Sequence, residues 1–115
     1  MALPAMERYI LDQDLEDMTQ SARKATGMLK ALAHEGRLMI LCFLATGEKS
    51  VSELEQLLQS RQAAVSQQLT RLRLEGLVDY RREGKAIYYR ISDDRAERML
   101  QLLYEMYCDP ERPDA

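Results

Sequence analysis

Residue types that build metal centres and disulfide frameworks are scarce in this sequence. It has two cysteines, Cys42 and Cys108, and a single histidine, His34, in 115 residues. Two cysteines do not make the disulfide framework of a small secreted protein, and there is no CxxC motif to bring two thiols together. A thiol oxidoreductase is therefore a weak hypothesis. Metal binding, redox chemistry and core packing are the interpretations left for the cysteines.

Long apolar runs are also missing. No run reaches the ~18 residues that a membrane-spanning helix needs. The N-terminal stretch MALPAMERYILDQDLED lacks the basic region and long apolar core of a secretory signal. We therefore expect a cytoplasmic protein without a membrane partner. The length and the 46% share of hydrophobic residues predict one globular domain spanning residues 1–115.

The charge of the chain is unevenly distributed. The net charge is −3, yet residues 61–90 contain seven basic and three acidic residues, so this segment carries +4 and the remainder −7. A basic patch on an acidic body can bind phosphate while the acidic remainder limits non-specific binding. This segregation argues against a domain that serves only in protein contacts.

The stretch at residues 52–91 is the most informative part of the chain. Ser52 is the expected N-cap of a first helix, and Glu55, three residues later, would complete a capping box. A second helix is predicted from about Gln62, and Gly76 stands where a helix ends in a left-handed residue. Two short helices with a polar connection predict a helix-turn-helix.

The second of these helices has two different faces. Val65, Leu69 and Leu72 recur at spacings of four and three and form its apolar face. The opposite face carries small, hydroxyl and amide side chains that can approach and hydrogen-bond base edges, although an ordinary solvated face is the alternative. The predicted DNA-binding residues on this helix are Gln62, Ala63, Ser66, Gln67 and Thr70.

A basic hairpin is predicted directly after the second helix. Residues 78–82 and 86–91 alternate in polarity, and Glu83, Gly84 and Lys85 form the turn, with Gly84 at positive φ. Such a hairpin is typical of a wing that contacts the DNA backbone, and a solvated hairpin is the alternative. The residues predicted to contact phosphate or the adjacent minor groove are Arg71, Arg81, Arg82 and Lys85.

Amphipathic helices flank this unit on both sides. One is predicted from about Asp14 to Leu32, and another begins after Ser92 as its N-cap and ends near Cys108. Both have apolar stripes that so short a chain cannot cover, so we expect a homodimer formed through the first and last helices. Two recognition helices related by a two-fold axis predict an inverted-repeat operator in double-stranded DNA.

The remaining segments are less distinctive. Residues 33–37 start a further helix, and residues 38–45 (LMILCFLA) are apolar all round, which predicts a central position. Residues 1–13 and 109–115 are expected to be flexible tails.

The order of these elements resembles the ArsR/SmtB winged-helix repressors. The likeness extends from about Leu15 to Cys108, and the matching segments are LKALAHEGRLMIL, VSELEQLL, AVSQQLTRLRLEGLV and REGKAIYYRI. It implies a mainly α fold with a small β-hairpin: a winged helix-turn-helix of about five helices plus a two-stranded wing. It further implies that the protein is no enzyme but a homodimeric repressor, released from DNA by an inducer.

The inducer implied by the resemblance depends on the cysteines. Arsenic and cadmium sensors of the family carry a CxC motif on the helix before the recognition helix, and zinc and nickel sensors carry histidine ligands on the last helix. Neither pattern is present here, and His34 is read as local structure. The pair Cys42 and Cys108 resembles that of the branch that responds to sulfide and persulfides and controls sulfide:quinone reductase and biofilm-growth operons.

That likeness implies reactive sulfur species as inducer, no cofactor, and a disulfide or polysulfide bridge between Cys42 and Cys108 that weakens DNA binding. A direct disulfide needs Cα atoms within about 7 Å, whereas a longer sulfur chain spans a wider gap. Alternatives remain for both thiols. A lone cysteine in an apolar helix is commonly core packing, and the two together could be the thiolate ligands of a metal-responsive repressor.

Overall fold

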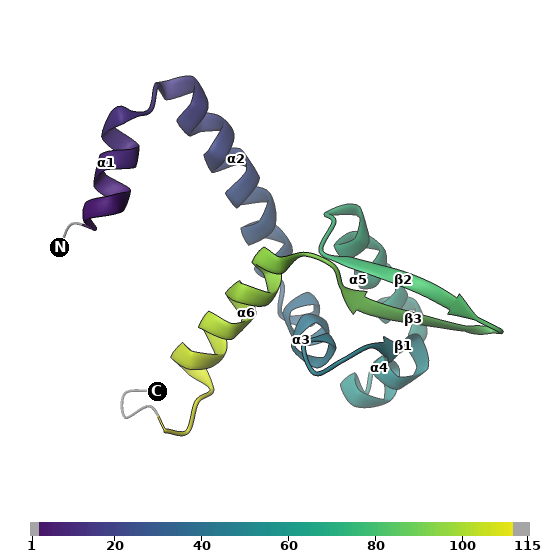
Figure 1. The fold of residues 1–115 in the computed structure, drawn as a ribbon. Helices are drawn as coiled ribbons and strands as arrows, with labels where there is room; N and C mark the ends of the chain where they lie inside the picture. The colour runs from purple at the N-terminus through teal and green to yellow at the C-terminus, as the bar shows by residue number, and fades with distance from the viewer. Residues whose placement is uncertain (1–2, 112–115) are drawn as a thin grey trace.

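The structure of the protein is a computed structural model that describes residues 3–111. Figure 1 shows the order of the elements within this range. They are α1 (Pro4–Asp12), α2 (Leu15–Leu32), α3 (Glu35–Leu44), β1 (Lys49–Ser50), α4 (Val51–Leu58), α5 (Gln62–Leu74), β2 (Val78–Glu83), β3 (Ala86–Ile91) and α6 (Asp94–Tyr107). This is a winged helix-turn-helix, as predicted, with six helices and three strands in the described residues instead of about five and two.

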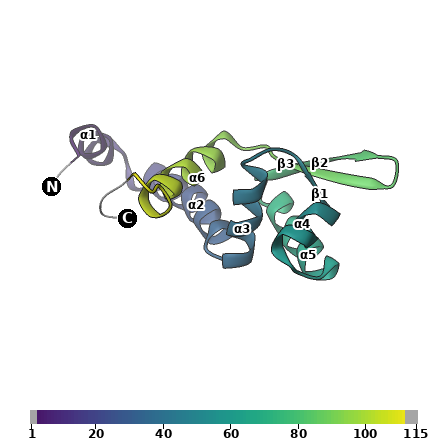
Figure 2. The ribbon, with the colours of Figure 1, turned by 90° about the horizontal axis from the view of Figure 1, so that it is seen from below.

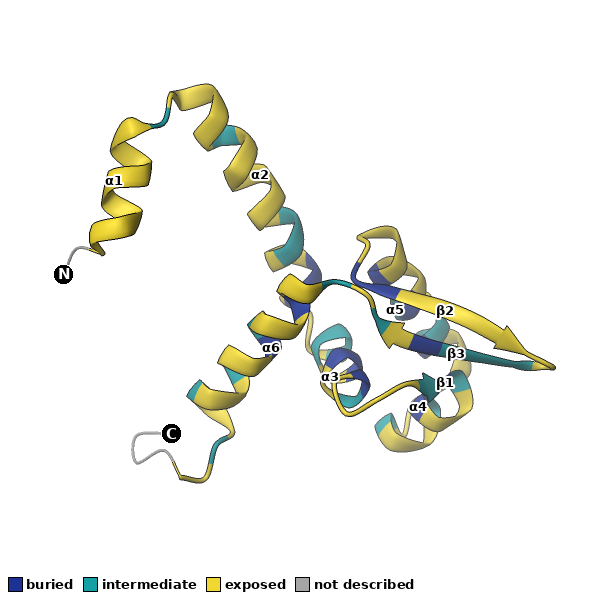
Figure 3. Cartoon of the chain, in the orientation of Figure 1, coloured by how far each residue is buried: buried dark blue, intermediate teal, exposed yellow. Residues whose placement is uncertain are grey.

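The hydrophobic core lies where α3, α4, α5 and the sheet meet. α3 packs against α2, α4, α5 and β3, which confirms its predicted central position. In Figure 3 the buried segments cluster in this region, whereas α1 and most of α2 and α6 are exposed. Figure 2 shows α1, α2 and α6 at one end of the molecule and the wing at the other. The largest fully buried side chains are Ile40, Leu41, Leu54, Leu69, Leu72 and Val65.

The wing belongs to a small antiparallel sheet in the order β1–β3–β2. β2 and β3 are joined by a two-residue turn at Gly84 and Lys85, in which Gly84 has φ +60°, as predicted. The third strand was not predicted, because two residues are too few to show alternation. β1 pairs Lys49 with Tyr89 and Ser50 with Tyr88, and so joins the wing to the end of α3.

Two predicted N-caps are wrong by one or two residues. α4 is capped by Ser50, whose hydroxyl accepts from the Glu53 N–H while the Glu53 carboxylate accepts from the Ser50 N–H, instead of by the predicted pair two residues later. Pairing in β1 holds Ser50 extended, so the helix begins at once. α6 is capped by Asp93 instead of Ser92, since the Ser92 N–H donates to the Leu77 carbonyl.

The N-terminal segment departs from the expected tail. α1 occupies most of residues 1–13, with Pro4 at its first turn and Glu7 complementing the helix dipole. It buries no residue, and its polar link to α2 is a 3.4 Å hydrogen bond between the Tyr9 and Ser21 hydroxyls. The expected tails at residues 1–2 and 112–115 lie outside the described range. No helix between residues 3 and 111 is both long and apolar enough to cross a bilayer.

Candidate functional site

The predicted recognition helix, α5, presents the face that the sequence analysis assigned to DNA. Val65, Leu69 and Leu72 are buried, which confirms the apolar face. The residues on the other side are exposed except for Ser66, which is half-buried: Gln62, Ala63, Gln67 and Thr70. α5 therefore turns small and amide side chains outward, where a groove could admit them. Their contact with bases remains a prediction.

The end of α5 fixes where the wing starts. The Gly76 N–H donates to the Arg73 carbonyl at 2.9 Å and the Leu77 N–H donates to the Leu72 carbonyl at 3.0 Å. With Gly76 at φ +79°, these bonds form a Schellman motif. Leu77 is buried and β2 begins with the next residue, so α5 and the wing are rigidly joined.

Some polar groups on α5 already have partners within the helix. The Thr70 hydroxyl donates to the Ser66 carbonyl at 2.9 Å, so it can still accept but has used its proton. Arg71 and Glu75 form an i,i+4 ion pair at 3.4 Å in which the arginine side chain is 57% exposed. Such a pair is weak and can yield to a phosphate.

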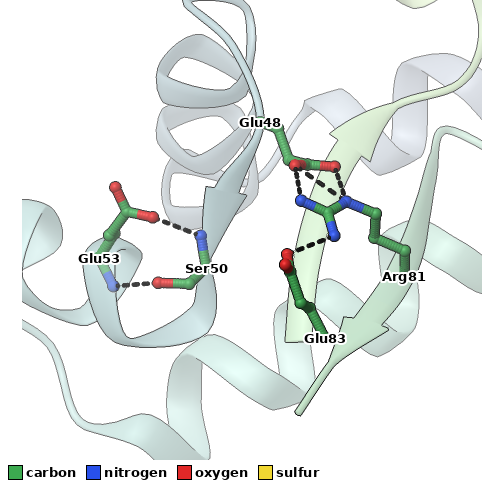
Figure 4. A network of polar contacts seen from close by, with 5 residues as sticks. All are labelled: Glu48, Ser50, Glu53, Arg81 and Glu83. Carbon is green, nitrogen blue, oxygen red and sulfur yellow. Dashed lines mark hydrogen bonds and ion pairs between the residues drawn. The ribbon is translucent and has the colours of Figure 1, made fainter. Parts of the chain in front are cut away.

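The basic residues of the wing differ in how free they are. The guanidinium of Arg81 donates from Nε and Nη2 to the Glu48 carboxylate, at distances of 2.8 to 3.1 Å, and from Nη1 to Glu83 at 2.8 Å (Figure 4). Its Cζ lies 4.7 Å from the ring centre of Tyr88. Hydrogen bonding from Arg81 lowers the pKa of the Glu48 carboxyl, and the two carboxylates raise the pKa of Arg81. This arrangement does not favour the predicted phosphate contact for Arg81.

The other two basic residues of the wing are open. Arg82 and Lys85 are exposed, and among residues 3–111 no ion pair involves either one. Lys85 lies in the turn, at the far end of the hairpin from the core (Figure 1). Both remain predicted phosphate contacts.

A contact that was not predicted joins α5 to the wing. The Arg73 guanidinium lies 4.9 Å from the ring centre of Tyr80 on β2, and that ring lies 5.6 Å from the ring of Tyr89 on β3. Arg73 was counted only as charge in the basic segment. The alternation of the two strands does put Tyr80 and Tyr89 on the same face of the sheet, the face toward α5. That pattern could not identify Arg73 as the contacting residue on the helix.

The two cysteines line the same hollow between α3 and α6. Cys42 lies on α3 and Cys108 is the C-cap of α6, and both open into a cavity of about 1090 Å³. Its apolar lining includes Leu38, Leu100, Leu103, Tyr104 and Tyr107. Both cysteines are exposed and unbridged. The alternative that Cys42 is core packing is therefore wrong.

The reactivity of Cys42 is set by its surroundings. Partial burial of the thiol, and to a smaller degree the charge of Cys108, raises the pKa of Cys42. A raised pKa keeps it mostly as the thiol near neutral pH.

His34 has the local structural role that was predicted. Its ring caps α3 and accepts from the Arg37 N–H at 3.4 Å. Arg37 in turn donates to the carbonyls of Lys30 and Ala31, closing the α2–α3 corner. Between residues 3 and 111, no three histidine, cysteine or acidic side chains gather as metal ligands. The alternative in which Cys42 and Cys108 are thiolate ligands of a metal stays a hypothesis.

Comparison with known proteins agrees with this geometry. Residues 34–80 match the model of the bacterial regulatory protein, arsR family. The biofilm growth-associated repressor of Agrobacterium fabrum is 50% identical over 97 residues, covering 84% of this chain and 83% of that protein. The structure of reduced HlyU from Vibrio cholerae superposes with a TM-score of 0.80 at 42% identity, covering 83% of this chain and 100% of that chain.

A third relative bears on assembly. The homodimeric winged helix-turn-helix DNA-binding domain of Mb0332 from Mycobacterium bovis has a TM-score of 0.71 at 32% identity, covering 83% of this chain and 87% of that one. These matches extend well beyond the helix-turn-helix itself. The relatives are transcriptional regulators, so the protein is a regulator and not an enzyme. It belongs to the ArsR family of winged helix-turn-helix transcriptional regulators.

Proposed function

We propose that the protein is a homodimeric repressor that binds an inverted-repeat operator while both thiols are reduced and leaves it when Cys42 and Cys108 are bridged. The observation that carries this proposal is the hollow between α3 and α6, which both thiols line. Two free thiols in one accessible cavity are suited to a cross-link, and they lie on the central helix α3 and at the end of α6.

The DNA half of the proposal rests on α5 and the wing. The outward face of α5 would enter the major groove, with Gln67 the best candidate for reading a base because amides can bond adenine at two points. Arg82 and Lys85 would contact the backbone nearby. Replacing Gln67 by alanine should change the preferred operator sequence more than the affinity for non-specific DNA.

The dimer half of the proposal rests on apolar side chains that the single chain leaves uncovered. α2 exposes Leu15, Met18 and Leu29, while α6 exposes Leu102 and Tyr104. A soluble monomer rarely leaves so many large apolar residues along two neighbouring helices. A second copy packed on α2 and α6 would cover them, and the homodimeric relative described above supports this assembly.

The proposed chemistry uses a low-molecular-weight persulfide, RSSH, as inducer. The Cys42 thiolate attacks the terminal sulfur, giving a cysteine persulfide and RSH. Attack by the Cys108 thiolate on the inner sulfur of that persulfide then forms a disulfide and releases H₂S. If both cysteines are first persulfidated, their condensation gives a trisulfide and H₂S. In each case the inducer is reduced and the two thiols are oxidised.

The cross-link would act on DNA binding through packing. α3 packs against α5, and α6 packs against β3 of the wing. A bridge from Cys42 to Cys108 would restrict the position of α3 relative to α6. It would thereby also restrict how α5 and the wing are placed relative to the proposed dimer interface. A coupling of about 1–3 kcal/mol, an ordinary value for allostery, would lower operator affinity by about 5- to 150-fold.

The decisive experiment compares operator binding by the reduced protein before and after treatment with an organic persulfide, together with intact mass. We expect operator affinity to fall as both thiols of one subunit are lost. The mass of the subunit should decrease by two hydrogens for a disulfide, or increase by one sulfur less two hydrogens for a trisulfide. Cys42→Ser and Cys108→Ser should each bind the operator like wild type and resist release. If both thiols react while operator affinity stays unchanged, the cysteines are not the switch.

A further inference from the structure

The Arg81 network links the wing to the loop that leaves the thiol-bearing helix. We propose that Arg81 is a positioning residue, not a DNA contact, and that its bond to Glu48 transmits the state of the thiol cavity to the wing. The inference rests on the proposed function, because it names the route by which bridging would alter DNA binding.

The geometry of Arg81 sets it apart from the other basic residues of the wing. In the sheet, Tyr88 on the middle strand pairs with Arg81 on one side and with Ser50 on the other. The arginine side chain reaches across the Tyr88 ring to Glu48, just before β1. One side chain therefore spans all three strands. Each guanidinium nitrogen already donates to a carboxylate, and Glu48 and Glu83 together offset its positive charge, so a phosphate would meet two negative groups there.

Hydrogen bonds connect the loop that carries Glu48 to the end of α3. The loop from α3 to β1 is Ala45-Thr46-Gly47-Glu48, and the Thr46 hydroxyl donates to the Phe43 carbonyl at 2.7 Å. The Lys49 ammonium donates to the Thr46 hydroxyl at 3.0 Å and to the Gly47 carbonyl at 3.1 Å. These bonds fold the loop back onto the last turn of the helix. A displacement at the C-terminal end of α3 would therefore carry Glu48 with it.

The same loop forms part of the thiol cavity. Thr46, Gly47 and Glu48 line the hollow together with Cys42 and Cys108. A cross-link between Cys42 and Cys108 would therefore shift the loop at residues 46–48, whose Glu48 binds Arg81. The chain of contacts runs from Cys42 through the end of α3 and Glu48 to Arg81 on β2.

Glu83 supplies a matched control. Its carboxylate also binds Arg81 at 2.8 Å, but it lies on the same strand as Arg81, two residues away. Glu48→Gln and Glu83→Gln each remove one of the two negative charges that neighbour the Arg81 guanidinium. Only Glu48→Gln cuts a link between separate elements, so the two variants separate linkage from charge.

The test measures operator affinity of the reduced and the persulfide-treated protein and takes their ratio. For Glu48→Gln we expect a ratio about fivefold smaller than that of wild type, which is what a well-formed exposed ion pair can contribute. For Glu83→Gln we expect a ratio within about twofold of wild type. Equal ratios for Glu48→Gln and wild type, or equal reductions in the two variants, would overturn the inference.

Amide hydrogen exchange of the reduced protein adds a readout that does not depend on induction. Exchange in β2 should be faster in Glu48→Gln than in Glu83→Gln, because only the former frees the wing from the α3 loop. Equal exchange in the two variants would show that Glu48 does not hold the wing. If wild type shows no release by persulfide, the proposed function fails and the signalling role with it, while the exchange comparison separately decides the link.

Discussion

Replacement of Lys85 by alanine gives a quantitative test of the wing. Lys85 lies at the second position of the turn between β2 and β3, is exposed, and has no ion-pair partner among residues 3–111. Its loss should therefore leave the fold intact and remove one positive charge at the tip. Any effect on DNA binding would come from a lost phosphate contact.

The size of the effect follows from counterion release. Each phosphate neutralised on B-DNA adds about 0.9 to the slope of log affinity against log salt concentration. A dimer presents two wings, so the variant should reduce the slope by about 1.8. Between about 50 and about 200 mM salt this makes the loss of affinity about tenfold smaller than in wild type.

The assay is operator binding by fluorescence anisotropy over a series of salt concentrations, with scrambled DNA in parallel. Arg8→Ala is the control, since it also removes one positive charge but lies on α1, at the opposite end of the molecule from the wing (Figure 2). Lys85→Ala should weaken binding to the operator and to scrambled DNA alike. A slope indistinguishable from wild type would refute the assignment of the wing tip to the phosphate backbone.

Three further predictions concern the core, a cap and a thiol. Leu69 on α5 is 0% exposed, so Leu69→Ala should lower the free energy of unfolding, measured in urea, by about 2–5 kcal/mol. A decrease of less than about 1 kcal/mol would contradict the packing of this side chain. Ser50→Ala should lower the free energy of unfolding by about 1 kcal/mol, whereas Ser52→Ala should change it little. A larger loss for Ser52→Ala than for Ser50→Ala would show that Ser52 is the N-cap of α4. In a Cys108→Ser background, alkylation of Cys42 should rise about tenfold per pH unit and still be rising at pH 9.0, since its pKa is raised from the ordinary value of 9.0. A rate that levels off below about pH 8 would contradict the raised pKa.

The parts of the fold that the sequence predicted are those governed by local chemistry. The spacing of Val65, Leu69 and Leu72 identified the buried face of α5, and Gly76 and Gly84 marked a helix end and a turn because few other residues accept positive φ. His34 was correctly read as a local structural residue. Each of these features depends on neighbours within a few positions along the chain.

The features that were missed depend on distant neighbours. β1 is two residues long and exists only because β3 pairs with it, and that pairing moved the cap of α4 from Ser52 to Ser50. The pairing of Arg81 with Glu48 was not predicted, because the two residues are 33 positions apart in sequence. The exposure of Cys42 could not be read from helix α3, whose apolar residues surround it on all sides in sequence.

The junction between α5 and the wing bears on how this domain can vary in length. Leu77 donates its N–H to Leu72 in the recognition helix and accepts at its carbonyl from the Ser92 N–H, one residue before the cap of α6. The Ser92 hydroxyl also reaches the Gly76 carbonyl, at 3.4 Å. An inserted residue at 76–77 or at 92 would break bonds in two elements at once, whereas the turn at Gly84 and Lys85 joins only its own two strands. Natural or engineered variants should therefore lengthen this chain at the tip of the hairpin and keep its base at constant length.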